Sequence, residues 1–364
     1  MKKWLSYIVV AMVCGLCFSS CTKDDEVTAG TDNRNVPVRL TLSLPASTSR
    51  AIDAPTEDGA LDPTTEKQSN INDVYVLVVD ATSNMLKYLV EDLKVSASGN
   101  NYNQKILEGT MMRTVGTEQV KLVVLANLAQ NNITNVSNIQ SYLKSMVGKS
   151  ITEIYNALVY NYTGPTHWDI DNRGIPMWGI SSSTSVPAQG TDLACDLYRA
   201  VAKVSIWVNQ KEGYQSTKGD FTITGITVND ANDKGYCVSQ ADLSPVENVQ
   251  YESPYVTGLS MVSQTFNYTD LNESTAYEDM IYLPEQINSD NRAVTLTVTY
   301  NYNGKAGLTG TIEFKKDGTG DRFNVVRNHV YVFNIILNST TTEITFQYQA
   351  MPWIDKTPVD IEFN

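Results

Sequence analysis

The segment THWDIDNRG comes closer to a catalytic or metal-binding pattern than any other part of this sequence. His167, Asp169 and Asp171 combine an imidazole with two carboxylates, a mixture used in metal sites and in acid–base catalysis. Trp168 beside them would suit a sugar-binding platform. The competing interpretation is a loop whose aspartates form local turns and whose tryptophan packs in a domain interface. We adopt the loop.

The rest of the chain offers few groups for catalysis. It contains only two histidines, and His329 opens an apolar segment in which we expect a strand-edge position. The acidic segment Asp230-Ala231-Asn232-Asp233 lacks the twelve-residue ligand pattern of an EF-hand and is interpreted as a solvated turn. No GxSxG, HExxH, P-loop or GxGxxG motif occurs. We therefore predict that the protein is not an enzyme and holds no cofactor and no metal.

The N-terminus carries a signal for covalent lipid attachment. Two lysines precede an apolar run, residues 7–18, which is short for a membrane span and typical of an export signal. The run ends in FSSC, where two small residues stand before a cysteine, as a lipoprotein signal peptidase requires. We predict that residues 1–20 are the signal peptide and that Cys21 is acylated. The alternative is an ordinary cleavage site near Cys21.

The five cysteines divide into three groups once this processing is applied. Cys14 and Cys17 leave with the signal peptide, and Cys21 carries lipid. Cys195 and Cys237 remain, and they could form one disulfide or stay as buried free thiols. Their spacing fits no metal site.

Composition indicates a packed globular protein with an acidic surface. The chain is 42% hydrophobic and 18% charged, with a formal net charge of −13. Because nucleic-acid phosphates require a basic face, this charge argues against nucleic acid as a partner.

Most of the chain has the two-residue periodicity of β-strands. Asn303-Gly304 separates two of the strand-like segments, as in a hairpin. Only residues 137–146 and 151–158 have helical spacing, and Ser150 is placed to cap the second, with Glu153 completing a capping box. We expect a mainly β protein with short surface helices. The predicted strands are residues 72–79, 119–125, 202–208, 221–228, 293–300, 310–314 and 330–337.

The length of the chain after residue 50 exceeds the roughly 250–300 residues at which single cores stop growing. Two domains are therefore expected. The loop-like segment 181–192 is the best boundary, because it is poor in apolar residues and lies between two strand-rich halves. We predict an N-terminal β-sandwich at residues 51–185 and a C-terminal one at residues 186–364.

Both ends of this body contain strands with one apolar face. The segment 36–44 alternates strictly and is followed by the small, polar stretch around Arg50, which has the character of a protease site. Its apolar positions are Val36, Val38, Leu40, Leu42 and Leu44. Near the C-terminus the corresponding apolar positions are Ile344, Phe346, Tyr348, Val359, Ile361 and Phe363.

These features suggest a maturation mechanism. Cleavage between Arg50 and Ala51 would release strand 36–44 from a sheet and open a groove with unpaired backbone groups and exposed apolar sites. A neighbour's segment 340–364 could fill that groove, and the head-to-tail contact would generate a filament. Trp353 then either packs in the core or anchors the donor segment. Arg50 is preferred as the cleavage site over Arg34, which precedes the strand, and over Arg39, which lies inside it.

The order and spacing of several segments resemble the major fimbrial subunits, or fimbrillins, of the type V pili of anaerobic Gram-negative commensals. The resemblance covers nearly the whole chain, and its C-terminal part looks most like the short-fimbria major subunit branch. The segments are the lipobox cysteine, VRLTLSLPASTSRA, INDVYVLVVDATSNMLKYL, KLVVLANLA, GIPMWGI, LYRAVAKVSIWV, MIYLPEQ, RNHVYVFNIIL and MPWIDKTPVDIEF.

The resemblance implies two transthyretin-like Greek-key β-sandwich domains and a lipidated propeptide at residues 21–50. It implies that the precursor reaches the outer membrane, that an arginine-specific protease cuts after Arg50, and that the subunit polymerises through its C-terminal strand with accessory anchor and tip subunits. A host or bacterial surface molecule would be its ligand. The alternative is a membrane-tethered lipoprotein that binds glycan or host protein, which includes a fimbrial anchor or tip subunit.

Overall fold

The computed structural model describes a set of segments that covers most of the chain. The chain divides into two units, residues 1–34 and residues 35–364, and all the elements below belong to the second unit. The described residues are 34–44, 71–96, 104–131, 133–162, 174–209, 221–239, 262–264, 277–289, 292–302, 304–315, 320–337 and 344–352.

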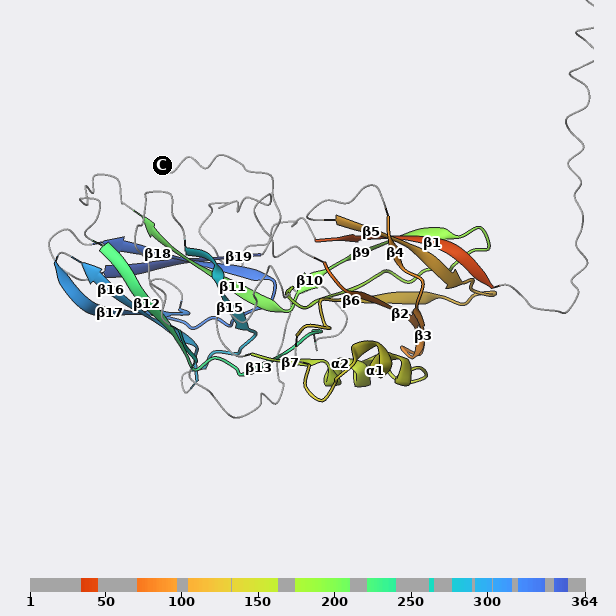
Figure 1. The fold of residues 1–364 in the computed structure, drawn as a ribbon, viewed down its shortest axis with the longest axis horizontal. Coiled ribbons are helices and arrows are strands. Elements are labelled where there is room, and N and C mark those ends of the chain that lie inside the picture. The colour runs from red at the N-terminus through yellow and green to blue at the C-terminus, as the bar shows by residue number, and fades with distance from the viewer. Residues whose placement is uncertain are drawn as a thin grey trace, which may run out of the picture. The chain divides into compact units, whose positions relative to one another are not determined.

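The protein is mainly β, as the periodicity predicts (Figure 1). The strands of the N-terminal half are β1 (Asn35–Ser43), β2 (Val74–Asp80), β3 (Leu86–Val90), β4 (Lys94–Val95), β5 (Gln104–Met112), β6 (Val120–Ala126), β7 (Val159–Asn161), β8 (Met177–Ile180), β9 (Thr191–Asp196) and β10 (Tyr198–Arg199). Those that follow are β11 (Val201–Asn209), β12 (Phe221–Asn229), β13 (Lys234–Tyr236), β14 (Val262–Gln264), β15 (Tyr277–Pro284), β16 (Thr295–Tyr302), β17 (Lys305–Glu313), β18 (His329–Leu337) and β19 (Ile344–Pro352).

Two sheets of the N-terminal half share one apolar core. Their strand orders are β4-β5-β1-β9 and β10-β8-β6-β2-β3. Val76 and Val78 of β2 face this core together with the apolar side chains of β1. Leu77 and Val79, on the opposite face of β2, belong to a second cluster that includes the helix residues Leu143 and Ile154. Because β2 is covered on both faces, it is a nearly continuous apolar run.

Two short helices cover that second face of the sheet, α1 (Ile139–Ser145) and α2 (Ile151–Ala157) (Figure 1). Asn138 Oδ1 accepts a hydrogen bond from Ser141 N at 2.8 Å, and Ser150 Oγ accepts one from Thr152 N at 3.3 Å. Both contacts satisfy backbone donors at a helix start. The two predicted helices and the Ser150 cap are confirmed. Neither helix of the described segments is long and apolar enough to cross a membrane.

The later strands form two further sheets, in the orders β15-β11-β18-β19 and β14-β12-β16-β17. Within the first of these, β11 and β18 run parallel. β16 and β17 pair antiparallel as the predicted hairpin, and Gly304 between them has a φ of 72°, which glycine adopts without strain. The short strand β13 pairs with β7 of the N-terminal half. The domain boundary at residues 185 and 186 stays a prediction.

Candidate interaction site around strand β1

Strand β1 has a hydrogen-bonded neighbour on each side. It pairs antiparallel with β5 along its whole length, from Asn35 opposite Met112 to Ser43 opposite Gln104. It pairs in parallel with β9, from Val38 beside Thr191 onward. From Val38 to Ser43 both edges are occupied, so the backbone donors and acceptors there have partners in the sheet. β1 is therefore an interior strand, and its removal would leave a strand-wide gap between β5 and β9.

The apolar face of β1 is buried, as the strict alternation predicts. Exposed or half-buried residues alternate with it along the strand. At roughly 1.5–3 kcal/mol for each fully buried side chain, this face represents on the order of 10 kcal/mol of burial. The exposed fractions are 5% for Val36, 6% for Val38, 2% for Leu40, 0% for Leu42 and 4% for Leu44.

Specific contacts fix the register between β1 and β9. Leu197 N donates to Ser43 O at 2.7 Å, and Ser43 Oγ donates to Asp196 Oδ1 at 3.2 Å. At the other end of the pair, Gly190 has a φ of 86° and lies so close to Pro37 that a Cβ there would clash with the Pro37 carbonyl oxygen. Only glycine fits this position without displacement of β1.

The covalent connections of β1 are simple. Residues 44–73 join it to β2. Arg50 and Ala51 belong to the part of this connection, residues 45–70, that lies outside the described residues, as does Cys21. A single cut after Arg50 would leave β1 held by non-covalent contacts alone. Arg39 has an exposed side chain, but its backbone is in the middle of the paired strand. Proteases bind extended, unpaired chain, so this pairing shields Arg39.

The predicted donor region lies partly in strand β19. This strand contains Ile344, Phe346 and Tyr348 and pairs antiparallel with β18 over its whole length. In the strand order it stands at the end of its sheet, so its pairing among the described strands is on one side only. The remaining predicted donor residues lie outside the described part of the chain. They are Trp353, Val359, Ile361 and Phe363.

A buried ion pair ties together the strands around β18. Glu285 Oε2 accepts hydrogen bonds from Arg327 Nε at 2.6 Å and from Arg327 Nη2 at 2.5 Å, and Nη2 also donates to Tyr236 O. His329 follows closely, with its Nδ1 at 2.8 Å from Arg327 O. It opens β18, which lies inside its sheet rather than at an edge, and burial lowers the pKa of its imidazole.

The acidic segment 230–233 is not a solvated turn as expected, because Asn232 is only 3% exposed. Its backbone N–H donates to Gln286 Oε1 at 2.8 Å, its Nδ2 donates to Glu285 O at 2.6 Å, and its Oδ1 accepts from Arg292 Nη2 at 2.5 Å. Asn232 is thus a buried polar junction, while Asp230 and Asp233 on either side of it are half-buried. Within the described segments no group of three or more metal-ligating side chains occurs.

The two remaining cysteines are free thiols. Cys195 and Cys237 are both buried, and burial raises the pKa of each from 9.0 to about 12. The sequence is compatible with a disulfide or with two free thiols, and the structure has the free thiols. The candidate His167, Trp168 and Asp169 cluster lies outside the described residues.

Two elements of the site escape sequence analysis. The first residues of strand β9 lie in the segment 181–192, which the sequence predicts to be a loop. The strand has a weak signal because only Leu193 and Cys195 give it an apolar face. The Glu285–Arg327 pair was also missed. A signal for the pair exists, since each charged residue stands next to an apolar strand, in IYLPEQ and in NVVRNHVYV.

Comparison with known proteins gives a family and a fold. Residues 31–357 match the profile of the family described as fimbrillin-A associated anchor proteins Mfa1 and Mfa2. A search of curated proteins gives no match. Among solved structures, the chain is similar to the tip fimbrial protein Mfa3 from Porphyromonas gingivalis with a C-terminal truncation. The identity is 15%, the TM-score is 0.56, and the match covers 88% of this chain and 100% of that one.

A second similar structure is a candidate cell adhesion protein from Parabacteroides distasonis ATCC 8503. It shares 15% identity with a TM-score of 0.51, over 89% of this chain and 99% of that one. Identities this low show the common fold alone.

Proposed function

Because the chain belongs to the family of fimbrillin-A associated anchor proteins Mfa1 and Mfa2, we propose that it is an accessory fimbrial subunit whose assembly site is the groove now filled by β1. As a member of this family, it is a fimbria-associated cell-surface protein and not an enzyme. It joins other fimbrial subunits by accepting a strand from one of them. The sequence resemblance pointed to a major subunit. The family description and the similarity to a tip protein favour an anchor or tip subunit instead.

One observation carries this proposal. β1 is an interior strand of its sheet, yet a single cut after Arg50 would break its covalent link to the following strands. β1 contributes five buried apolar side chains and has paired neighbours on both edges, yet only residues 44–73 link it to the rest of the body. A strand with the same alternation could replace it and recover the same burial and the same backbone hydrogen bonds.

The proposed maturation begins at the N-terminus. Lipid on Cys21 tethers the precursor to the outer membrane. An arginine-specific protease cuts between Arg50 and Ala51, and an incoming strand displaces β1. A subunit that escapes the cut keeps both its lipid and its filled groove, so it stays tethered and cannot accept a strand.

The second candidate function is a major subunit, which must donate a strand as well as accept one. It is supported by the place of β19 at the end of its sheet, because a chain segment at a sheet edge can detach with fewer broken contacts than an interior strand. Segment 340–364 would then be the donor. The two candidates differ in whether the cleaved protein polymerises with itself.

The test is a strand-exchange assay on the chain from residue 22 to residue 364. The protein is treated with an arginine-specific protease, its new N-terminus is sequenced, and binding of a fluorescent peptide with the sequence of residues 34–45 is followed by anisotropy. We expect a new N-terminus at Ala51 and peptide uptake by the cleaved protein only. The variant Arg50→Ala should stay uncut and take up no peptide.

The matched control peptide carries Leu42→Asp, which places a charge at a fully buried position and should not bind. A denaturing gel without boiling then separates the candidates. An accessory subunit gives single bands, whereas a major subunit gives a ladder of multimers. Cleaved protein that takes up neither peptide overturns the proposal.

A further inference from the structure

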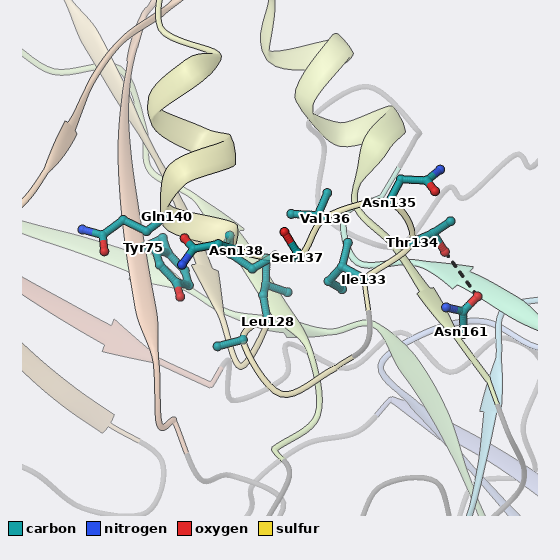
Figure 2. Close-up of a pocket in the computed structure, with 12 residues that line it drawn as sticks. Tyr75, Leu128, Ile133, Thr134, Asn135, Val136, Ser137, Asn138, Gln140 and Asn161 are labelled. Atoms are coloured by element: carbon teal, nitrogen blue, oxygen red, sulfur yellow. Dashed lines mark hydrogen bonds between the residues drawn. The ribbon is translucent and has the colours of Figure 1, made fainter.

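A second surface, remote from β1 in the strand order, has the character of a small-ligand site. A hollow of about 690 Å³ lies between the segment that joins β6 to α1, Tyr75 of β2 and Asn161 of β7 (Figure 2). From its geometry and lining, we infer that it binds a neutral carbohydrate. Its volume is within the range of sites for small organic ligands, roughly 300–1,000 Å³.

The hollow is shaped by an ordered segment. Asp73 Oδ2 accepts hydrogen bonds from Leu128 N and Ala129 N at 3.0 Å each, which fixes the start of the segment. Thr134 N donates to Val159 O at 2.7 Å, which fixes its middle against β7. Asn135 has a φ of 61°, a left-handed conformation that turns the chain around the hollow. A site held in this way needs little reorganisation to bind a ligand.

The floor of the hollow is apolar and its rim is polar. Leu128, Ile133 and Ile139 are buried beneath it. Tyr75 is half-buried and offers a ring whose face can pack against the C–H groups of a sugar, while its hydroxyl remains a hydrogen-bonding group. Above this apolar floor, polar side chains make up half of the lining, which suits a ligand with many hydroxyl groups.

The polar groups of the rim are amides and hydroxyls. Figure 2 shows Gln140 towards one end of the hollow and Asn135 towards the other, with Ser137 and Asn138 between them. The oxygen of Asn138 accepts from Ser141 N, which leaves its amide nitrogen as a donor. Because amides and hydroxyls both donate and accept, they match the hydroxyl groups of a sugar, which do the same.

The lining excludes other ligand classes. None of the described residues that line the hollow is charged, although the chain as a whole carries a net charge of −13. An anionic ligand would call for arginine or lysine at hydrogen-bond distance, and a hard metal ion would call for carboxylates. A neutral polyhydroxyl ligand requires neither.

The experiment uses saturation-transfer NMR on the purified protein with three neutral disaccharides, maltose, lactose and N,N′-diacetylchitobiose. We expect saturation transfer to at least one of them, followed by a measurable affinity in a titration. In the variant Gln140→Ala the affinity should fall about fivefold, the effect of one neutral hydrogen bond. The variant Ala129→Trp, which fills the hollow from an exposed rim position, should abolish binding.

Gln130→Ala is the matched control, because Gln130 is an exposed glutamine of the same segment that does not line the hollow. It should bind like the unmodified protein, and thermal unfolding should show all three variants folded. Failure of all three disaccharides to bind overturns the inference, and so do equal affinities in Gln140→Ala and Gln130→Ala. Uptake of the β1 peptide does not involve this hollow, so the two proposals fail independently.

Discussion

Glu285 and Arg327 form an ion pair inside the protein, with side chains only 5% and 1% exposed and two contacts of 2.6 Å and 2.5 Å to the same carboxylate oxygen. The pair joins the end of β15 to the start of β18, and through Tyr236 O it reaches β13, which pairs with β7. It therefore connects strands of two sheets.

Loss of one partner should destabilise the fold strongly, because the other charge would stay buried alone. We expect Arg327→Met to lower the free energy of unfolding by about 3–5 kcal/mol. Urea denaturation measures this change. The double variant Glu285→Leu/Arg327→Met should recover most of the loss, since it buries no charge. A double variant that is no more stable than Arg327→Met would show that the lone Glu285 charge is not the cause of the loss.

Substitutions on the core face of β1 should lower the free energy of unfolding more than substitutions on its outer face. Leu42→Ala should destabilise the uncut protein by about 2–5 kcal/mol, because it leaves a cavity at a fully buried site. Arg39→Gln changes an exposed residue of the same strand and should cost less than about 0.5 kcal/mol. Denaturant unfolding of both variants provides the comparison. Equal effects would contradict the placement of β1 in the core.

The close approach of β1 to the loop before β9 predicts a difference between two glycines. Gly190 and Gly148 have φ values of 86° and 82°, so alanine at either position pays the cost of a left-handed conformation, about 1–2 kcal/mol. Only at Gly190 would the new Cβ also clash with the backbone of Pro37, whereas nothing lies within 4 Å at Gly148. We expect Gly190→Ala to lower the melting temperature more than Gly148→Ala. Equal shifts would show that the Pro37 contact is relaxed.

Burial of His329 should make stability depend on pH. Because its folded pKa lies below the ordinary value of 6.5, its contribution is complete above pH 6.5 and is lost as the pH falls through and below that value. Thermal unfolding from pH 7.5 to 5 should show this loss, and His329→Asn should reduce it. His167→Gln serves as the control for the other histidine. An unchanged pH profile in His329→Asn would refute the role of this imidazole.

The sequence predicts the strands best where one face is uniformly apolar. Strand β1 was expected at residues 36–44 and occurs at Asn35–Ser43, because five apolar residues alternate with polar ones without interruption. Hairpins were also predictable, since the turn at Gly304 is local in sequence. These signals depend only on neighbours along the chain.

Contacts between distant segments were not predictable in the same way. Nothing in TDLACD indicates that β9 runs parallel to β1, because parallel partners share no local turn signal. Asn232 was expected in solvent, yet its partners come from the segment near Gln286, far along the chain. The hollow beside Tyr75 likewise depends on Asn161 and on the fold of the segment after β6.

The parallel pairing of β1 and β9 also sets an order of events in folding. Ser43 and Asp196 are 153 positions apart, so β1 cannot acquire its second neighbour until more than half of the chain has been synthesised. During that interval one edge of β1 stays open to the surroundings, and other chains with unpaired strands can pair with it. We therefore expect a chain of this topology to fold slowly, because a contact between distant segments must form before β1 is fully paired.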